Sequence, residues 1–261
     1  MKVDVLIAAY NSQNYIVQCL DSVNKQSFKA CRIIIIDDCS SDLTLKVINE
    51  YKAISIVPIL IIANKKNLGL TKSLNLGLDL CTSELIARLD ADDLWHEKKL
   101  EFQVNFLKKN KKIHFCCSNI NFLGEINTNK QTTFILKTTD FPLTNPYNHS
   151  SLLIYKKVIN SINNYNQFYK YSQDTDLYFR LLKNGYEGEI LIDKLVERRI
   201  SENIIGLKKR RQQLFFFWTV QIRYFFSRLK ENRLRLLVSI IKTSLRFLIP
   251  QKLINKLKHA F

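Results

Sequence analysis

Carboxylates gather in two short segments of the sequence, where they could hold a metal ion. Asp37-Asp38 and Asp90-Ala91-Asp92-Asp93 each follow a run of mostly apolar residues. By itself, an Asp-x-Asp pair is more often a loop or a helix cap than a metal site. Clustered acids repel one another, and a divalent cation bridged to phosphate oxygens would relieve that repulsion. Two carboxylates together with substrate phosphates would suit Mg²⁺ or Mn²⁺.

A rigid support for these acids is predicted by the hydrophobic periodicity of the N-terminal part of the chain. Short apolar runs predict four strands, over residues 3–9, 32–36, 54–62 and 84–89. Helical spacing of apolar residues predicts helices between them, over residues 14–26, 43–51 and 70–81. Residues 33–36 show no polar alternation, as a strand covered on both faces requires. Strands that alternate with helices predict an α/β fold with a doubly wound, mostly parallel central sheet and flanking helices.

The carboxyl ends of the predicted strands are where such a sheet would bind a ligand. There the sequence places residues 10–11, 37–38 and 90–93. It lacks the Gly-x-Gly-x-x-Gly turn and the phosphate-loop Lys, which disfavours dinucleotide oxidoreductases and P-loop NTPases. Beyond these strands, the pattern predicts a helix, a strand, an irregular acceptor-side region, a strand and a helix, over residues 97–109, 113–118, 119–148, 149–155 and 176–183.

Four motifs in this part of the chain resemble, in order and spacing, those of the family 2 glycosyltransferases. They are Val5-Leu6-Ile7-Ala8-Ala9-Tyr10-Asn11, Ile34-Ile35-Ile36-Asp37-Asp38-Cys39-Ser40-Ser41-Asp42, Asn67-Leu68-Gly69-Leu70-Thr71-Lys72-Ser73-Leu74-Asn75 and Ala87-Arg88-Leu89-Asp90-Ala91-Asp92-Asp93. The similarity continues through His149-Ser150-Ser151 and Gln173-Asp174-Thr175-Asp176 and covers about residues 1–206. It implies a GT-A fold and an inverting transfer from a nucleotide-diphosphate sugar, expected to be a UDP-sugar.

The resemblance also implies roles for residues at the strand ends. Tyr10 would stack on the nucleotide base, and Asp38 would accept a hydrogen bond from base or ribose; a packed aromatic and a helix cap are the alternatives. Asp90 would contact ribose or a metal-bound water, and Asp92 would ligate the Mg²⁺ or Mn²⁺ ion that bridges the two phosphates. Further residues expected to bind substrate are Ala8, Asn11, Lys72, Asn75, Arg88, Ala91, His149 and Asp176.

Several of these residues have ordinary structural alternatives. Arg88 and Lys72 could neutralise the diphosphate, or they could be a strand-end ion pair and part of a solvated face. His149 could contact the acceptor or be a hydrogen-bonded structural histidine. Asp176 could bind the acceptor or be structural. Many relatives carry an Arg-x-His segment after the base helix, and here Ser201 stands where that His is expected.

Asp174 is the expected catalytic base, which takes the proton of the acceptor hydroxyl. It precedes the apolar face of a predicted helix, whose positive dipole end would keep the carboxylate ionised. It also matches the position of the family's base, although the preceding residue is commonly Glu and here is Gln173. Capping of the helix is the alternative role.

The last 55 or so residues have a different composition, and we treat residues 207–261 as a separate extension of a catalytic domain over residues 1–206. This segment holds fourteen Lys or Arg and one acid, so it carries +13 of the net charge of +17. Apolar residues predict one face of a first helix, at Leu214, Trp218, Ile222, Phe225 and Leu229. Similar spacing predicts a second helix over residues 234–248 and a shorter third piece over residues 253–257.

Basic amphipathic helices of this kind are typical of segments that lie on a membrane surface. The extension could bind an anionic membrane, or it could dock its apolar faces on the catalytic domain. Nucleic-acid binding is not expected, because the wide apolar faces need to be covered.

We therefore expect a metal-dependent hexosyl- or N-acetylhexosaminyltransferase of cell-surface polysaccharide assembly, such as lipopolysaccharide, capsule or O-antigen. Its expected partners are a nucleotide-sugar donor and a glycan or lipid-linked acceptor. We expect a cytoplasmic protein, held peripherally at the inner face of the cytoplasmic membrane. The contrasting hypothesis is a non-catalytic scaffold that binds sugar nucleotide or membrane.

Overall fold

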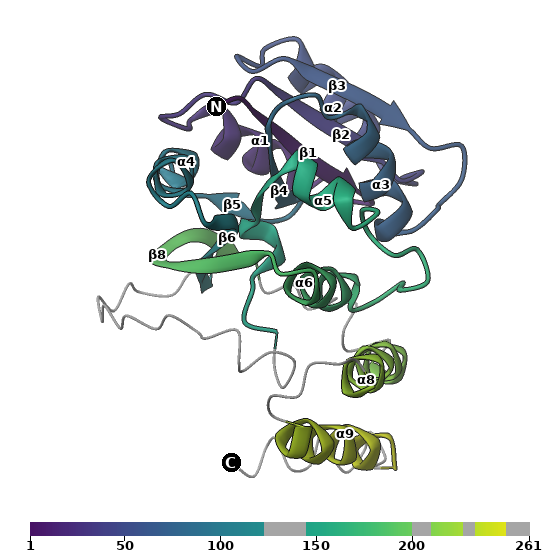
Figure 1. The fold of residues 1–261 in the computed structure, drawn as a ribbon. Coiled ribbons are helices and arrows are strands. Elements are labelled where there is room, and N and C mark those ends of the chain that lie inside the picture. Colours follow the sequence, from purple (N-terminus) through teal and green to yellow (C-terminus); the bar gives the residue numbers. More distant parts are fainter. Residues whose placement is uncertain (123–144, 200–209, 227–232, 249–261) are drawn as a thin grey trace.

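The structure is a computed structural model that describes residues 1–122, 145–199, 210–226 and 233–248. Its centre is one sheet, with the strand order β3-β2-β1-β4-β7-β6-β8-β5 (Figure 1). The strands are β1 (Val3–Ala9), β2 (Arg32–Asp37), β3 (Ile59–Ala63), β4 (Leu85–Asp90), β5 (Leu94–Trp95), β6 (Ile113–Phe122), β7 (Leu153–Tyr155) and β8 (Glu187–Arg198).

The first four strands form a parallel half of the sheet, which sets the position of the acids. In the pairing of β1 with β2, Ala9 lies opposite Asp37, and in the pairing of β1 with β4, Ala8 lies opposite Asp90. The two acidic segments therefore leave the sheet at the same edge. β7 runs antiparallel to β4 and β6, and β8 runs parallel to β6. The predicted doubly wound, mostly parallel α/β sheet is confirmed.

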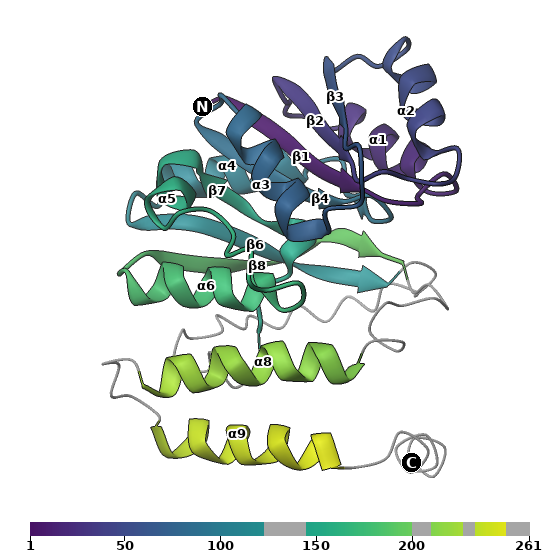
Figure 2. The ribbon, with the colours of Figure 1, turned by 90° about the vertical axis from the view of Figure 1, so that its right-hand side faces the viewer.

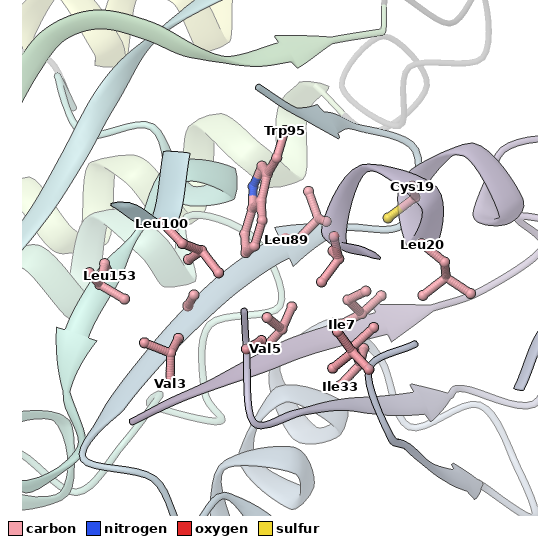
Figure 3. Packing of buried hydrophobic residues seen from close by; sticks show 14 of the residues in the cluster. Val3, Val5, Ile7, Cys19, Leu20, Ile33, Leu89, Trp95, Leu100 and Leu153 are labelled. Atoms are coloured by element: carbon pink, nitrogen blue, oxygen red, sulfur yellow. The ribbon is translucent and has the colours of Figure 1, made fainter. Parts of the chain in front are cut away.

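Helices cover both faces of the sheet. One face packs against α1 (Ile16–Asn24), α2 (Thr44–Lys52) and α4 (Lys99–Lys109), and the other against α3 (Leu70–Leu80), α5 (Lys156–Ser161) and α6 (Gln173–Lys183). Strand β2 sends Ile33 and Ile35 into the first cluster and Ile34 and Ile36 into the second, and all four are fully buried. Figure 3 shows the first cluster, in which Val5, Ile7 and Ile33 approach Leu20 and Trp95.

Two predicted strands begin later than expected. Residues 54–58 lie outside β3, because the backbone N–H of Val57 donates to the side chain of Asn24 at 2.9 Å instead of to a neighbouring strand. Residues 149–151 form a 3₁₀ turn instead of a strand, because the Asn148 side chain accepts the N–H of Ser150 at 3.1 Å. The sequence pattern also missed β5, β8 and α5. Strand β8 has several exposed charged residues and lies near the end of the sheet, so its apolar run is only three residues long, Ile190 to Ile192.

Two further helices, α8 (Arg210–Phe225) and α9 (Arg233–Leu248), lie below α6 as successive layers (Figure 2). The sequence predicted one apolar face for the first helix, but α8 has apolar residues on two sides. A second stripe, Phe216, Val220 and Tyr224, packs against the second hydrophobic cluster, and Val220 is fully buried. The Phe216 ring lies 6.0 Å from the ring of Tyr169, and the Tyr224 ring lies 4.9 Å from that of Phe179.

The opposite side of α8 contacts α9. Trp218 donates from Nε1 to Oγ of Ser244 at 3.0 Å, and Gln221 donates from Nε2 to Oγ of Ser239 at 2.8 Å. Because α8 is a middle layer, its apolar residues are divided between two neighbours, as expected for a helix covered on both sides. The predicted third piece, residues 253–257, lies outside the described residues.

Lys99 is an unusual member of the core on the α4 side. It is fully buried, and its Nζ lies 3.7 Å from the centroid of the Trp95 ring. Within the described part of the chain, Nζ has no hydrogen-bond partner. Burial lowers the pKa of Lys99 from 10.5 to about 7, and the neighbouring Cys116 and Cys117 act in the opposite direction.

Replacing Lys99 with Met should stabilise the protein, because Met has a similar length and no ammonium group to bury. Between pH 7 and 10.5 the unfolded chain binds a proton that folded Lys99 does not, so wild-type stability rises with pH across this window. The gain from Lys99→Met is therefore largest at and below about pH 7 and disappears above pH 10.5. Thermal unfolding at several pH values measures it, with a rise in Tm of roughly 2–4 °C for each kcal/mol gained. The exposed neighbour Lys98, changed to Met, should show no such trend; equal behaviour of the two variants would contradict the prediction.

Candidate active site

The carboxyl edge of β4 is organised by an ion pair between Arg88 and Asp90. Arg88 is buried, and its Nη1 donates to Oδ2 of Asp90 at 2.6 Å while its Nη2 contacts Oδ1. A bidentate pair of this kind fixes the orientation of both groups. The Asp90 side chain is 36% exposed, so it faces the open edge of the sheet while Arg88 lies beneath it. Of the two roles expected for Arg88, the structure contains the strand-end ion pair.

The next acids, Asp92 and Asp93, lie close enough to Asp90 to feel its charge. Burial, followed by the Asp90 carboxylate, raises the pKa of Asp92. Burial and the charges of Asp90 and Asp92 raise the pKa of Asp93 to about 7. Ala91 between them is buried. The segment therefore holds several carboxylates close together, and the nearby cationic groups of the chain do not fully offset their repulsion.

These carboxylates fit a hard divalent cation whose remaining ligands come from the substrate. Within the ranges that the structure describes, no three His, Cys, Asp or Glu side chains are grouped closely enough to enclose an ion. Mg²⁺ is commonly held by one or two carboxylates together with substrate phosphates. Asp92, with Asp90 beside it, supplies carboxylate oxygens of that kind, and a cation would relieve the repulsion that raises the pKa of both Asp92 and Asp93.

Asp38, at the end of β2, holds the loop that leads into α3. One of its oxygens accepts the N–H of Leu68 and the other accepts the N–H of Gly69, both at 2.8 Å. Asn64 donates to the same carboxylate at 2.8 Å. Gly69 has φ +86°, a left-handed conformation that favours glycine. The carboxylate has about four acceptor positions, so the three hydrogen bonds leave roughly one for a nucleotide.

The end of β1 presents Tyr10 and Asn11 at the same edge. Tyr10 is 50% exposed, so a face of its ring is available for stacking. Asn11 has φ +50°, and its Oδ1 accepts the N–H of Ser41 at 2.9 Å. Ala8 is half-buried and lies opposite Asp90. Non-glycine residues with positive φ also occur at Cys39 and Ser172, and such conformations often gather at functional sites.

Asp174 comes from α6 and lies close enough to Arg88 and Asp90 for their charges to affect it. It lies in the first turn of the helix and is half-buried, and Asn145 donates from Nδ2 to its Oδ2 at 2.8 Å. Burial raises the pKa of Asp174; the N–H of Thr175 and the charge of Arg88 lower it, and the charge of Asp90 raises it. The structure therefore places the predicted base in the same electrostatic environment as Arg88 and Asp90.

His149 is buried and has a structural contact. Its Nε2 is 2.6 Å from the hydroxyl of Tyr165, and burial, with a contribution from Arg88, lowers its pKa well below the usual value. The adjacent Ser150 accepts the backbone N–H of Asp90 at 3.1 Å. The turn that carries these two residues therefore supports β4 from its neighbour β7.

Two predicted substrate residues have partners elsewhere, and a third, Lys72, is exposed in the first turn of α3. Asn75 donates from Nδ2 to the carbonyl of Tyr165 at 2.9 Å, and its Oδ1 accepts the N–H of Tyr165 at 3.0 Å. It also lines a cavity of about 760 Å³ between α3, α5 and α6. Asp176 is fully buried, and its two oxygens are 2.7 Å from Nε of Arg180 and 3.5 Å from Nη1 of Arg223. In this structure Asp176 connects α6 to α8.

Several neighbours of the acids were not identified from the sequence as site residues. Asn145 orients Asp174, the Cys19 thiol donates to the carbonyl of Asp90 at 3.4 Å, and the N–H of Arg199 donates to Asp93 at 3.3 Å. Only Arg199 carried a usable signal, because it belongs to the segment in which relatives have Arg-x-His. Ser201, the residue at the expected His position, lies outside the described residues.

Known proteins share this sequence pattern. The family model named Glycosyl transferase family 2 matches residues 4–183. The amylovoran biosynthesis glycosyltransferase AmsE of Erwinia amylovora is 28% identical over 211 residues, which cover 78% of this chain and 79% of that protein. A UDP-Gal:alpha-D-GlcNAc-diphosphoundecaprenol beta-1,3-galactosyltransferase of Escherichia coli is 26% identical over 278 residues, which cover 98% of this chain and 97% of that protein.

Solved structures share the fold. S. aureus TarS 1-349 in complex with UDP-GlcNAc has a TM-score of 0.75 at 16% identity and covers 95% of this chain, which corresponds to 73% of that chain. The mannosyltransferase PcManGT from Pyrobaculum calidifontis, in complex with GDP-Man and Mn²⁺, has a TM-score of 0.69 at 13% identity, with coverage of 93% and 73%. At these identities the likeness concerns the fold alone.

Asp38→Asn should loosen the loop before α3. The NH₂ group of Asn replaces one carboxylate oxygen, and it cannot accept the hydrogen bond from the backbone N–H that faces it. We expect a loss of about 1–3 kcal/mol in the free energy of unfolding and faster hydrogen exchange at the amides of Leu68 and Gly69. Asp79→Asn, an exposed change on α3, is the matched control. Unchanged exchange at both amides in Asp38→Asn would show that the carboxylate does not hold this loop.

Proposed function

Because this chain belongs to glycosyl transferase family 2, we propose that it transfers a sugar from a UDP-sugar, with inversion, to a glycan or lipid-linked glycan of bacterial cell-surface polysaccharide. The names of two relatives support this: one refers to amylovoran biosynthesis, and the other to UDP-galactose and a diphosphoundecaprenol-linked acceptor. The transferred group is a hexosyl or N-acetylhexosaminyl residue. Structures with the same fold hold UDP-GlcNAc or GDP-Man.

The observation that carries the proposal is the common environment of Asp174 and the acids at the end of β4. An inverting displacement needs a leaving-group site on one side of the anomeric carbon and a base on the other. Asp90 and Asp92 belong to the carboxyl edge of the sheet, whereas Asp174 comes from α6 and is held by Asn145. Arg88 lies close enough to Asp90 and Asp174 to affect both.

In the proposed reaction, one bond forms as another breaks. The acceptor hydroxyl oxygen attacks the anomeric carbon, and the bond from that carbon to the diphosphate oxygen breaks, so its electron pair leaves with the nucleoside diphosphate. Asp174 takes the proton from the acceptor hydroxyl. Burial suits this role, because it raises the pKa of the carboxylate toward the pH at which it would work. Tyr10 would stack on the base of the donor, and Asp38 would accept one hydrogen bond from it.

The fit of the acids to Mg²⁺ or Mn²⁺ extends the proposal to metal dependence. Asp92 would hold the ion, while Asp90, fixed by Arg88, would contact ribose or a water on the ion. A divalent ion bound there stabilises the negative charge that develops on the departing diphosphate.

Asp174→Asn should lower kcat for sugar transfer by about 10²–10⁴-fold, because Asn keeps the shape of Asp but cannot accept the proton of the acceptor hydroxyl. Binding of UDP-sugar, measured by calorimetry in the presence of Mn²⁺, should change little, since Asp174 contacts the acceptor. Asp193→Asn, at an exposed acid of β8, should leave transfer unchanged. Transfer by Asp174→Asn at the wild-type rate would exclude Asp174 as the base.

Asp92→Asn should remove the metal-dependent part of donor binding. For the wild type, UDP with Mn²⁺ should raise Tm more than UDP alone, since a ligand at 100 times its Kd adds about 2.7 kcal/mol of stability. In Asp92→Asn the two conditions should give the same Tm. Glu97→Gln, a nearby exposed acid, serves as the control. If Mn²⁺ still enhanced the shift in Asp92→Asn, the ion would have to be held elsewhere.

A further inference from the structure

Helix α9 has two different faces. Leu236, Ile240 and Thr243 are at most 7% exposed, and they lie on the side that packs against α8. Leu237, Val238 and Ile241 point away from α8 and are 41%, 44% and 50% exposed. Because residues three and four apart share one side of a helix, these three form a single apolar stripe. We call Leu237, Val238 and Ile241 the outer stripe of α9.

Within the part of the chain that the structure describes, the position of α9 leaves the outer stripe exposed. Figure 2 shows α6, α8 and α9 as stacked layers, with α9 farthest from the sheet. Helix α8 differs in this respect, because Phe216 and Val220 face the catalytic domain while Trp218 and Gln221 contact α9. The structure thus assigns most of the apolar surface of α8 to packing, and the sequence pattern alone did not separate the two helices.

Charge indicates what could cover this stripe. The exposed Lys242 lies next to Ile241. Residues 207–261 contain fourteen Lys or Arg and one acid, whereas the first 206 residues carry only +4 of the net charge. An apolar stripe in such a cationic segment matches a surface with an apolar interior and anionic headgroups. Within the described residues, no helix is long and apolar enough to cross a membrane.

We propose that the outer stripe of α9 docks this protein on the anionic surface of a lipid bilayer. The inference deepens the proposed function, on which it rests, because it brings the active site to an acceptor carried on a lipid. With helix layers packed 8–10 Å apart, the axis of α6 lies roughly 20 Å from that of α9. The docked orientation therefore holds Asp174, at the start of α6, above the bilayer surface instead of within it.

The test compares two double variants of the full chain. Val238→Glu/Ile241→Glu places two carboxylates in the outer stripe at positions where Glu suits the helix. Ile54→Glu/Ile56→Glu makes the same chemical change at side chains that are 76% and 74% exposed, in the loop between α2 and β3 at the opposite end of the molecule (Figure 1). Circular dichroism and Tm establish that both variants are folded.

Flotation with vesicles of phosphatidylglycerol and phosphatidylcholine, and with phosphatidylcholine alone, is the measurement. We expect the wild type and the Ile54/Ile56 variant to bind the anionic vesicles at least about tenfold more tightly than the neutral ones, and the Val238/Ile241 variant to lose at least about tenfold of that binding. Raising NaCl to about 1 M should release the wild type, since the Debye length falls to about 3 Å. Equal binding by the two double variants would overturn the proposal.

Two further measurements separate this inference from its alternatives. Sedimentation in the absence of lipid tests whether the stripe joins two copies of the chain; a wild-type dimer that Val238→Glu/Ile241→Glu converts to monomer, with vesicle binding intact, would overturn membrane docking. Transfer to a water-soluble acceptor should be equal in both variants and the wild type. Absence of that transfer in all three proteins would count against the proposed function, whereas loss of vesicle binding alone bears only on α9.

Discussion

The buried ion pair between Arg88 and Asp90 is the interaction on which the candidate site depends. A guanidinium that is 3% exposed must be paired, because an unpaired charge is strongly disfavoured in the interior. Asp90 fulfils this at the end of β4, and its orientation is fixed by two contacts from Arg88. The same cation affects the pKa of His149 and of Asp174. The positive charge of Arg88 therefore acts both on Asp90 at the edge of the sheet and on Asp174 at the start of α6.

The acids beyond that pair are less well compensated. Asp93 is nearly fully buried, and its raised pKa, about 7, reflects the charges of Asp90 and Asp92 as well as burial. Non-glycine residues with positive φ, such as Asn11 and Ser172, occur in the same region. Folding alone would not favour these features, and sites that bind ligands commonly retain them. A bound cation would balance the carboxylate charges that the chain leaves close together.

The helices after the catalytic region connect this site to the surface of the molecule. Asp176, two residues after Asp174 on α6, pairs with Arg180 and Arg223 instead of facing the acids. Helix α8 is thereby held against α6 by an ion pair as well as by aromatic contacts such as that of Phe179 with Tyr224. Any surface that α9 binds is consequently connected to Asp174 through two packed helices, which gives the proposed membrane orientation a physical basis.

The sequence by itself determined the central sheet and the acids at its edge. Ile33 to Ile36 predicted a strand buried on both faces, and the motifs at Asp38, Asp90 to Asp93 and Asp174 predicted the fold that the structure has. These features depend on local periodicity and on residues near one another in the chain. Strand β8 was missed because it pairs with β6 at long range and its apolar run is only three residues long. Only the tertiary structure decided that Asp176 faces Arg223 and that Asn145 holds Asp174. It also decided that, among the elements described, α8 is covered on both sides while the outer stripe of α9 stays exposed. Each of these depends on which segments pack together, and a pattern of residue types along one helix cannot show which of its faces meets a neighbour.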